Sequence, residues 1–562
     1  MKRINPAEDL EKIFNAKLRS LKYFEPLDFK FNSDCSHGDI STPVALRIGK
    51  ARKLDSMHVA EKIIEGIKLP PYISQVGISK PGFINLTLSD RYLLKFLARP
   101  IKLPLQSSLK KERVIVEYSS PNIAKPFGVG HLRSTIIGDA VANLYEALGA
   151  KVWRINHIGD WGTQFGKLIY AFKKWGSQEV LEEDPIAEMF NLYVRFHAEV
   201  ELDPSIEGKA RYWFKKLEDS DAEAVSIWKK FSHWSLIEFN RIYQILGIKF
   251  DDQNGESSYL QEAKNIIDEL KRKKLAEESE GALVVKFEDE EITPALLVKS
   301  DGATTYIARD LAALKKRLVT LKGDVIIYHV GSEQRLHFLQ LFEIAQKAGW
   351  IRNQKLIYAS HGLMRLPEGK MSTRKGRVIE LDKILEEAIS RAYTVVNDKN
   401  PNLPKIKKQE IAEAVGIGAV KYNDLQNHRS TEITFEWDKI LSFEGNSAPY
   451  LQYTYARLKS IYRRAHIRAK ISCELNDDEK NIARKLAQFP SVLYNAANTE
   501  SPNILATYLY ELAGALSSYY EKYPIIKSDI KTRRHRMAVI LSGANIIKLG
   551  LELLGIKTPE EI

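Results

Sequence analysis

The stretch that decides the fold is Glu117–Thr135, which reads EYSSPNIAKPFGVGHLRST. It overlaps the β-branched run RVIVEYS (113–119), which predicts a short buried strand. Apolar residues then recur every four positions from Leu132 to Leu144, and Gly149 follows, as expected of a helix and its stop. KVWRIN (151–156) predicts the next strand. The stretch therefore joins strand to helix in a doubly wound, Rossmann-type parallel sheet.

Small and polar residues fill the turn between this strand and helix. The N-terminus of a helix offers free N–H groups and a partial positive charge to phosphates. Gly128 and Gly130 would let a ligand approach the backbone, His131 could donate to a phosphate oxygen, and Lys125 adds a cation. The alternative is a glycine loop that only packs helix on strand, because a short glycine motif is a weak signal.

Other polar residues are expected at the same edge of the sheet. Ser120 and Asn122 follow the first strand, and Gln334 in VGSEQ follows a later strand, DVIIYHV (324–330). Tyr306 and Asp310 lie four apart, on one face of a predicted helix, where an acid beside a phenol could hold a cation. A packed tyrosine, a surface aspartate and an ordinary turn residue are the alternatives.

A basic segment, GLMRLPEGKMSTRKGRVIEL (362–381), contains Lys370, Arg374 and Lys375 between two glycines. A glycine-hinged basic loop suits a mobile clamp on polyphosphate. Alone, it could also be a solvated run of charges.

Length and composition indicate a chain of several domains. With 562 residues, two to four domains are expected. We predict an N-terminal α/β domain (1–105), a catalytic domain (106–400) with a helical insertion at about 170–270, and a helical C-terminal domain (401–562). Hydrophobic residues make up 44% and charged residues 28%, as in soluble globular proteins. The net charge of +12 weakly favours a polyanionic partner.

Several classes of protein are disfavoured. The two cysteines, Cys35 and Cys473, cannot build a disulfide framework or a four-ligand zinc site, so we expect no protein-bound metal. No apolar run is long enough for a membrane span. The N-terminus MKRINPAEDLEKIF carries acidic residues early and fits neither a secretory signal nor a transit peptide, so a cytoplasmic location is expected.

The C-terminal part carries basic residues beside aromatics. Tyr450 and Tyr453 precede Arg457 and Arg464 in APYLQYTYARLKSIYRRA. Such pairing suits single-stranded bases and phosphates. A solvated helix face with core tyrosines is the alternative.

Six motifs in order resemble those of arginyl-tRNA synthetases, which are class I aminoacyl-tRNA synthetases: EYSSPNIAKPF, HLRSTIIGD, RINHIGDWGTQFG, TTYIARD, KMSTRKG and GNSAPYLQYTYARL. GVGH and KMSTR resemble the two class I signatures, usually written HIGH and KMSKS. HGDISTPVAL (37–46) and PGFIN (81–85) resemble the additional N-terminal tRNA-binding domain of this family. The C-terminal helices would then be the anticodon-binding domain.

The resemblance implies a two-step reaction. L-arginine reacts with ATP, as its Mg²⁺ complex, to give arginyl-adenylate, and the arginyl group then passes to tRNA(Arg). No prosthetic group is expected, and a monomer is implied. By resemblance the catalytic residues are His131, Lys125, Lys370, Arg374 and Lys375; those at ATP are Gly128, Gly130, His131, Met371 and Ser372; those at arginine are Glu117, Ser120, Asn122, Tyr306, Asp310 and Gln334; and those at tRNA are Tyr450, Tyr453, Arg457 and Arg464.

Two positions depart from the signatures. Gly128 replaces the first histidine of HIGH, and Thr373 replaces the fourth residue of KMSKS, a lysine. Each change removes a possible donor to the transition state. Lys125 occupies the place from which a family lysine is thought to compensate.

Two other functions compete with this interpretation. A small nucleotidyltransferase shares the GxGH loop but needs neither the C-terminal helices nor Tyr306 and Asp310. A non-catalytic tRNA-binding paralogue would fit Gly128 and Thr373, but has no reason to keep His131, Lys125 and the arginine pocket together.

Overall fold

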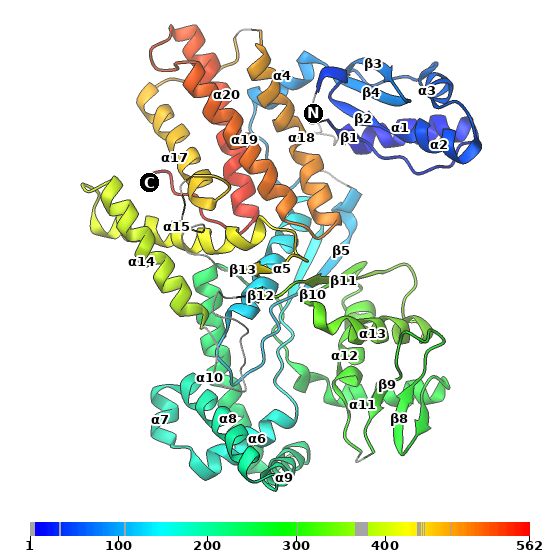
Figure 1. Ribbon diagram of the computed structural model, residues 1–562, viewed down its shortest axis with the longest axis vertical. Coiled ribbons are helices and arrows are strands. Elements are labelled where there is room, and N and C mark those ends of the chain that lie inside the picture. Colours follow the sequence, from blue (N-terminus) through cyan, green and yellow to red (C-terminus); the bar gives the residue numbers. More distant parts are fainter. Residues whose placement is uncertain are drawn as a thin grey trace.

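The computed structural model describes residues 6–32, 35–105, 108–300, 302–365, 380–434, 440, 442, 444–472 and 474–562. An N-terminal α/β unit lies beside a bundle of C-terminal helices, and a central parallel sheet leads from this bundle to a lobe of insertion helices (Figure 1). The predicted multidomain α/β architecture is confirmed.

The central sheet has the strand order β11-β10-β5-β6 and is parallel throughout. β5 (Arg113–Glu117), α5 (Val129–Ala147) and β6 (Lys151–Ile155) form the predicted strand–helix–strand unit. The chain later returns on the other side of β5 as β10 (Val325–Gly331) and β11 (Lys355–His361). The strand order therefore reverses between β5 and β10. In such sheets ligands bind outside the carboxyl ends of the strands at this switch point.

Both faces of the sheet are buried, which explains the continuous apolar run of β5. Val114 and Val116 face the core shared with α5 and the C-terminal helices, whereas Ile115 faces a second core formed with helices in residues 260–347. Alternate residues of a strand point to opposite faces, so an internal strand covered on both sides needs apolar residues throughout.

α5 packs closely on the end of β5 because Gly138 has no side chain. A Cβ at Gly138 would lie 2.2 Å from the Cβ of Tyr118. This close approach fixes the start of α5 next to the carboxyl end of the strand.

The segment after β6 is helical, as the sequence predicts. Its helices are α6 (Thr163–Trp175), α7 (Gln178–Glu183), α8 (Pro185–Leu202), α9 (Ile206–Glu218), α10 (Ala222–Leu246) and α11 (Leu260–Arg272). A small antiparallel sheet and two helices follow: β7 (Glu277–Ser279), β8 (Ala282–Val285), β9 (Ala295–Val298), α12 (Tyr306–Lys315) and α13 (Arg335–Lys347).

The N-terminal unit is a four-stranded antiparallel sheet with helices. Its elements are α1 (Pro6–Ser20), β1 (Lys30–Phe31), β2 (Ile40–Thr42), α2 (Val44–Arg52), α3 (Ser56–Ile64), β3 (Ile73–Ser79), β4 (Phe83–Leu88) and α4 (Asp90–Ala98). It is tied to the C-terminal helices, since Arg484 pairs with Asp39 at 2.6 Å and the Ser542 hydroxyl donates to the Leu97 carbonyl at 2.9 Å.

The C-terminal helices are α14 (Leu381–Lys399), α15 (Lys405–Leu425), α17 (Ala448–Ala465), α18 (Asp477–Asn498), α19 (Asn503–Lys522) and α20 (Ile530–Leu553); the short strands β12 (Met364–Arg365) and β13 (Ile433–Thr434) pair in parallel. α14 and α15 share a small core around Val396 and Val415. The expected boundary at residue 400 falls in the turn between them, so it would divide this shared core.

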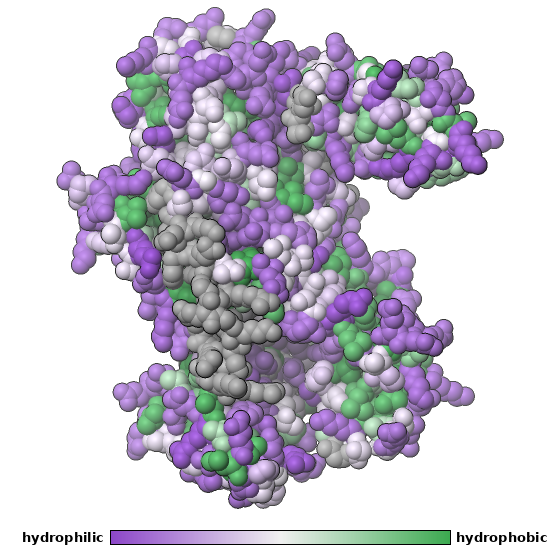
Figure 2. Space-filling model, in the orientation of Figure 1, coloured by the Kyte–Doolittle hydropathy of each residue, from purple (hydrophilic) through white to green (hydrophobic). Residues whose placement is uncertain are grey.

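The visible face of the molecule is mostly hydrophilic, and its hydrophobic residues are scattered in small areas (Figure 2). The N-terminal unit and the lobe of α11–α13 stand apart along one side, with an open recess between them. Within the described part of the chain, no helix is long and apolar enough to cross a membrane.

Arg133, on α5, ties the central sheet to the C-terminal helices. Its side chain is fully buried and its guanidinium pairs with Asp424 of α15 at 3.0 Å. The same guanidinium donates to the carbonyls of Gly362 (2.9 Å), Thr431 (2.7 Å) and Arg429 (3.3 Å). A buried guanidinium needs partners for its donors, so these segments are held around one side chain.

We predict that Asp424→Leu lowers the free energy of unfolding by about 3–5 kcal/mol, because it leaves the buried charge of Arg133 unpaired. Arg241→Met is the control; it removes exposed pairs with Glu238 and Asp382 and is expected to cost less than about 1 kcal/mol. Urea denaturation of both variants measures the difference. Equal, small losses would contradict a structural role for the buried pair.

Candidate active site

The loop between β5 and α5 has an unusual backbone. Ser119, Ser120 and Ala124 have φ angles of 72°, 46° and 61°. Side chains with a Cβ are disfavoured in this left-handed region by roughly 1–2 kcal/mol each. Such residues persist only where surrounding contacts hold them, and they cluster at functional sites.

Three other elements hold this loop in place. Its N–H groups donate to side chains of α5, of the residue after β6, and of α10: Ser119 to Ser134 (3.0 Å), Ser120 to Asn156 (3.0 Å) and Ala124 to Ser235 (2.8 Å). The Tyr243 hydroxyl of α10 lies 2.8 Å from the Ser119 hydroxyl and accepts from the Asn156 amide at 3.0 Å. The insertion helix α10 therefore shapes the loop.

His131 lies in the first turn of α5. Its Nδ1 accepts the N–H of Gly128 at 3.2 Å, and its ring packs 5.2 Å from that of Phe127. Burial, and then the charge of Lys125, lower the pKa of His131 to about 4. The imidazole is therefore neutral at pH 7. Because Nδ1 accepts, Nε2 carries the proton and is the donor.

Lys125 and Gly130 lie beside this histidine. Lys125 extends over the ring of Tyr193 in α8, with Nζ 4.8 Å from the ring centroid. Gly130 is exposed, and a Cβ built on it would have no other atom within 4 Å. The structure thus brings Lys125, Gly128, Gly130 and His131 together at the start of α5.

The second signature lies outside the described residues, and with it Lys370, Met371, Ser372, Arg374 and Lys375. The chain on either side of it lies near α5. After the gap, Glu380 pairs with Gly128 in an antiparallel bridge and the Leu381 N–H donates to the Phe127 carbonyl at 2.9 Å. Before the gap, the Gly362 carbonyl accepts from Arg133 of α5.

Asp310 is the centre of a second group of polar residues. It lies on α12, as predicted, one turn after Tyr306. Its Oδ1 lies 3.2 Å from Nε2 of His157 and its Oδ2 lies 2.8 Å from Nε2 of His337. Burial opposes ionisation of Asp310, but the hydrogen bond from His337 and the adjacent imidazole of His157 outweigh it and hold the pKa of the carboxyl below its usual value. Asp310 is therefore ionised at neutral pH.

Two arginines neutralise the neighbouring carboxylates. Glu117 at the end of β5 forms a buried ion pair with Arg317, whose Nη1 also donates to the Tyr328 hydroxyl at 2.9 Å. Glu256 pairs with Arg309 at 2.8 Å. The sequence analysis expects Glu117 at the bound arginine; in the structure its carboxylate already has a protein guanidinium as partner.

The other predicted pocket residues lie at the edge of the sheet. Asn122 is exposed and pairs with Gly159 in a parallel bridge, while Ser120 is half-buried. Gln334 is exposed in the turn before α13, and Tyr306 is 62% exposed, with its ring 5.5 Å from that of His337.

Sequence reasoning did not single out His157, His337 or Arg317. His157 stands in a quoted motif just after a strand, where the carboxyl edge of the sheet was expected, so its position was a usable signal. His337 and Arg317 carry no comparable signal, because only the fold shows that they face Asp310 and Glu117.

The predicted tRNA-binding residues share one face of α17. Tyr450, Arg457 and Arg464 are spaced by seven residues, and Tyr453 lies between the first two. Arg457 lies 5.2 Å from the centroid of the Tyr453 ring and donates to the Tyr520 hydroxyl at 2.6 Å. Arg464 is exposed.

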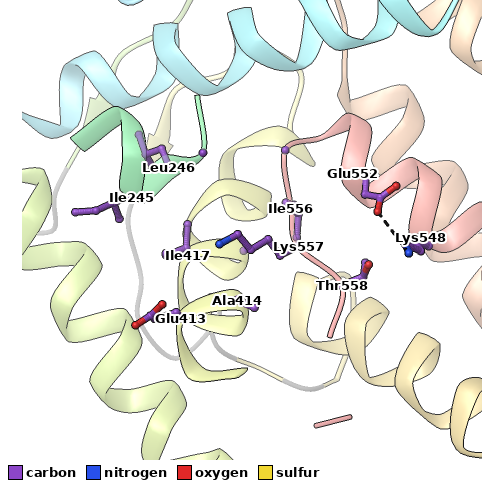
Figure 3. A pocket seen from close by; sticks show the side chains of 13 residues that line it. Ile245, Leu246, Glu413, Ala414, Ile417, Lys548, Glu552, Ile556, Lys557 and Thr558 are labelled. Atoms are coloured by element: carbon purple, nitrogen blue, oxygen red, sulfur yellow. Dashed lines mark ion pairs between the residues drawn. The ribbon is translucent and has the colours of Figure 1, made fainter. Parts of the chain in front are cut away.

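A separate cavity of about 340 Å³ lies between the end of α10, α15 and the residues after α20 (Figure 3). Leu246, Ile417 and Ile556 line its apolar walls, and Glu413 and Lys557 are at its charged margin. It contains none of the predicted site residues. Among the described residues, there is also no cluster of three or more His, Cys, Asp or Glu side chains that could hold a metal ion.

Family models match nearly the whole chain. The model described as tRNA synthetases class I (R), catalytic domain, matches residues 94–437. The DALR anticodon binding domain matches 451–562, and the arginyl tRNA synthetase N terminal domain matches 8–88. Together with the parallel sheet and the GVGH turn, they define a class I aminoacyl-tRNA synthetase.

Individual proteins that are similar to this chain identify its family within this class. The arginine–tRNA ligase of Fusobacterium nucleatum is 40% identical over 98% of both chains, and that of Halothermothrix orenii is 41% identical over 93% of this chain and 94% of its own. The crystal structure of the Plasmodium falciparum arginyl-tRNA synthetase covers 100% of both chains with 26% identity and a TM-score of 0.85. The Thermus thermophilus enzyme has the same fold, with 24% identity, 99% and 100% coverage and a TM-score of 0.86. The chain belongs to the arginyl-tRNA synthetase family.

We predict that the imidazole of His131 stays neutral down to about pH 5, since its pKa lies near 4. Below that pH a proton on Nδ1 would break the bond from Gly128. NMR spectra of ¹³C-labelled histidine, assigned with a His131→Gln variant, follow this titration. A midpoint between pH 6 and 7 for His131 would contradict the half-buried imidazole that accepts from Gly128.

Proposed function

We propose that the protein ligates L-arginine to tRNA(Arg), with ATP, bound as its Mg²⁺ complex, as the energy source. The observation that supports this most is the pairing of two groups at one sheet edge: the start of α5, with His131 and Lys125, and the ionised Asp310. The first suits a phosphate chain, and the second suits a guanidinium, which has five donors and no acceptor.

In the first step, a carboxylate oxygen of arginine attacks the α-phosphorus of ATP. The bond to the bridging oxygen breaks, and pyrophosphate leaves with its electron pair. Nε2–H of neutral His131 donates to a phosphate oxygen, and Lys125 supplies positive charge. Catalysis of this kind depends on positioning and on stabilising charge on oxygen, so no protein nucleophile is required.

In the second step, a ribose hydroxyl of the terminal adenosine of the tRNA attacks the arginyl carbonyl. AMP leaves, and the arginyl ester is formed. Lys370, Arg374 and Lys375, with Met371 and Ser372, are assigned to the ATP phosphates by resemblance alone.

The substrate side chain is assigned to Asp310 and Tyr306. Gln334 is assigned beside them, and Glu117, Ser120 and Asn122 are assigned to the amino-acid end. The carboxylate of Glu117 adds negative charge near the pocket, although its ion pair with Arg317 offsets most of that charge. The face of α17 that carries Tyr450, Tyr453, Arg457 and Arg464 is assigned to tRNA, because basic and aromatic groups together suit RNA.

The three-domain division at residues 105 and 400, a monomeric state and a cytoplasmic location belong to the same proposal. The curated relatives are named as ligases, so the non-catalytic alternative has no support from them.

Arginine-dependent exchange of pyrophosphate into ATP, with and without tRNA(Arg), tests the function directly. Exchange that requires arginine supports the proposal. A folded protein with no exchange under either condition would refute it.

We predict that Asp310→Ala lowers kcat/KM for arginine in this exchange by about 100-fold or more. Loss of two hydrogen bonds to a charged group removes about 3 kcal/mol or more. Asp268→Ala, at an exposed position on α11, is the control and is expected to be unchanged. Wild-type kinetics in Asp310→Ala would reject its assignment to the guanidinium.

We predict that Lys125→Ala slows adenylate formation at least tenfold, because one lost donor to the transition state costs about 3 kcal/mol. The exposed Lys264→Ala, also on α11, provides the comparison. The rate of a single turnover measures the step itself. A reduction smaller than tenfold would mean that Lys125 does not compensate for Gly128 and Thr373.

A further inference from the structure

We infer that His337 is a positioning residue of the arginine pocket: together with His157, it holds Asp310 in the orientation in which both carboxylate oxygens can accept from one guanidinium. This inference rests on the proposed function and names residues that determine how well the substrate side chain is held.

The geometry around Asp310 is the first argument. Two imidazoles approach its two oxygens from different elements, His157 from the chain after β6 and His337 from the first turn of α13. An ionised carboxylate has about four acceptor positions. The hydrogen bond from His337 to Oδ2 and the contact of His157 with Oδ1 restrict the rotation of the carboxylate and leave acceptor positions for a bidentate guanidinium.

The charges of the neighbouring residues are the second argument. Three carboxylates lie together at this pocket: Glu117, Glu256 and Asp310. Glu117 and Glu256 each have an arginine of the protein as ion-pair partner. Asp310 is held by imidazoles instead, and its side chain is 22% exposed. Among the described residues no arginine pairs with Asp310, so its carboxylate can accept from a guanidinium of the ligand.

The surroundings of His337 are the third argument. Its side chain is 17% exposed, and its ring lies 5.5 Å from that of Tyr306 and 5.3 Å from that of Phe338. Phe338 is buried against Tyr328 beneath the site. The ring of His337 is thus seated on the core on one side and borders the exposed Tyr306 on the other. His337 also lies one helical turn after Gln334, so one short segment supplies both a proposed ligand and the group that positions Asp310.

Two substitutions at His337 test the inference. His337→Leu removes the donor and keeps an apolar side chain against Phe338. His337→Gln keeps a neutral amide donor at about the reach of Nε2. His58→Leu, at a histidine that is 61% exposed on α3 of the N-terminal unit, is the control.

Pyrophosphate exchange with tRNA present, at varied arginine and varied ATP, is the measurement. In His337→Leu we expect the KM for arginine to rise at least tenfold, the kcat to stay within about threefold, and the KM for ATP to remain unchanged, since a hydrogen bond to a charged group is lost in the amino-acid pocket. We expect His337→Gln to recover most of the affinity and His58→Leu to behave as wild type.

The possible results of this experiment distinguish a failure of the inference from a failure of the proposed function. An unchanged KM for arginine in His337→Leu, with an active wild type, would overturn the inference alone. The same holds for a loss of kcat that His337→Gln does not restore and that accompanies a lower melting temperature, because that result indicates a merely structural role. If the wild type neither exchanges with arginine nor is stabilised by it in thermal unfolding, the proposed function falls and the inference falls with it.

Discussion

The buried pair of Arg133 and Asp424 is the constraint on which the rest of the structure depends. Arg133 lies two residues beyond His131 on α5, and its guanidinium is surrounded by α15 and by the carbonyls of Gly362 and Thr431. A charge in a dry interior must keep all of these partners. As a result, the helix that carries the candidate phosphate site, the chain before the second signature and the C-terminal helices cannot separate without exposing the same ion pair to solvent.

The candidate pocket follows the same rule of matched charge. Glu117 and Glu256 are each neutralised by an arginine of the protein, and Asp310 is held by imidazoles. Two guanidinium groups already bound inside the protein show which surroundings this side chain needs: carboxylates, a phenol and the faces of aromatic rings. The proposed pocket for the guanidinium of free arginine, which lies near Arg317, offers the same kinds of partner.

Much of this arrangement could be predicted from the sequence, because local patterns determine it. The β-branched run before Glu117 and the four-residue spacing from Leu132 indicated the strand–helix–strand unit, and TTYIARD indicated a helix with Asp310 on it. Pairing between distant positions could not be predicted. Glu117 and Arg317 are 200 positions apart, and no periodicity in either segment shows that one carboxylate faces the other guanidinium. The left-handed residues of the loop were equally hidden, since serine and alanine do not mark such a backbone.

That backbone has a consequence for how the chain can evolve. Ser119, Ser120 and Ala124 hold conformations that glycine would adopt more easily, and Ser235 and Tyr243 of the insertion help to keep them there. Helix α10 of the insertion therefore helps to hold the loop in its left-handed conformation. A lineage that shortened α10 would also have to change the sequence of the loop, so the two segments are expected to be inherited together although their contacting residues are more than 100 positions apart.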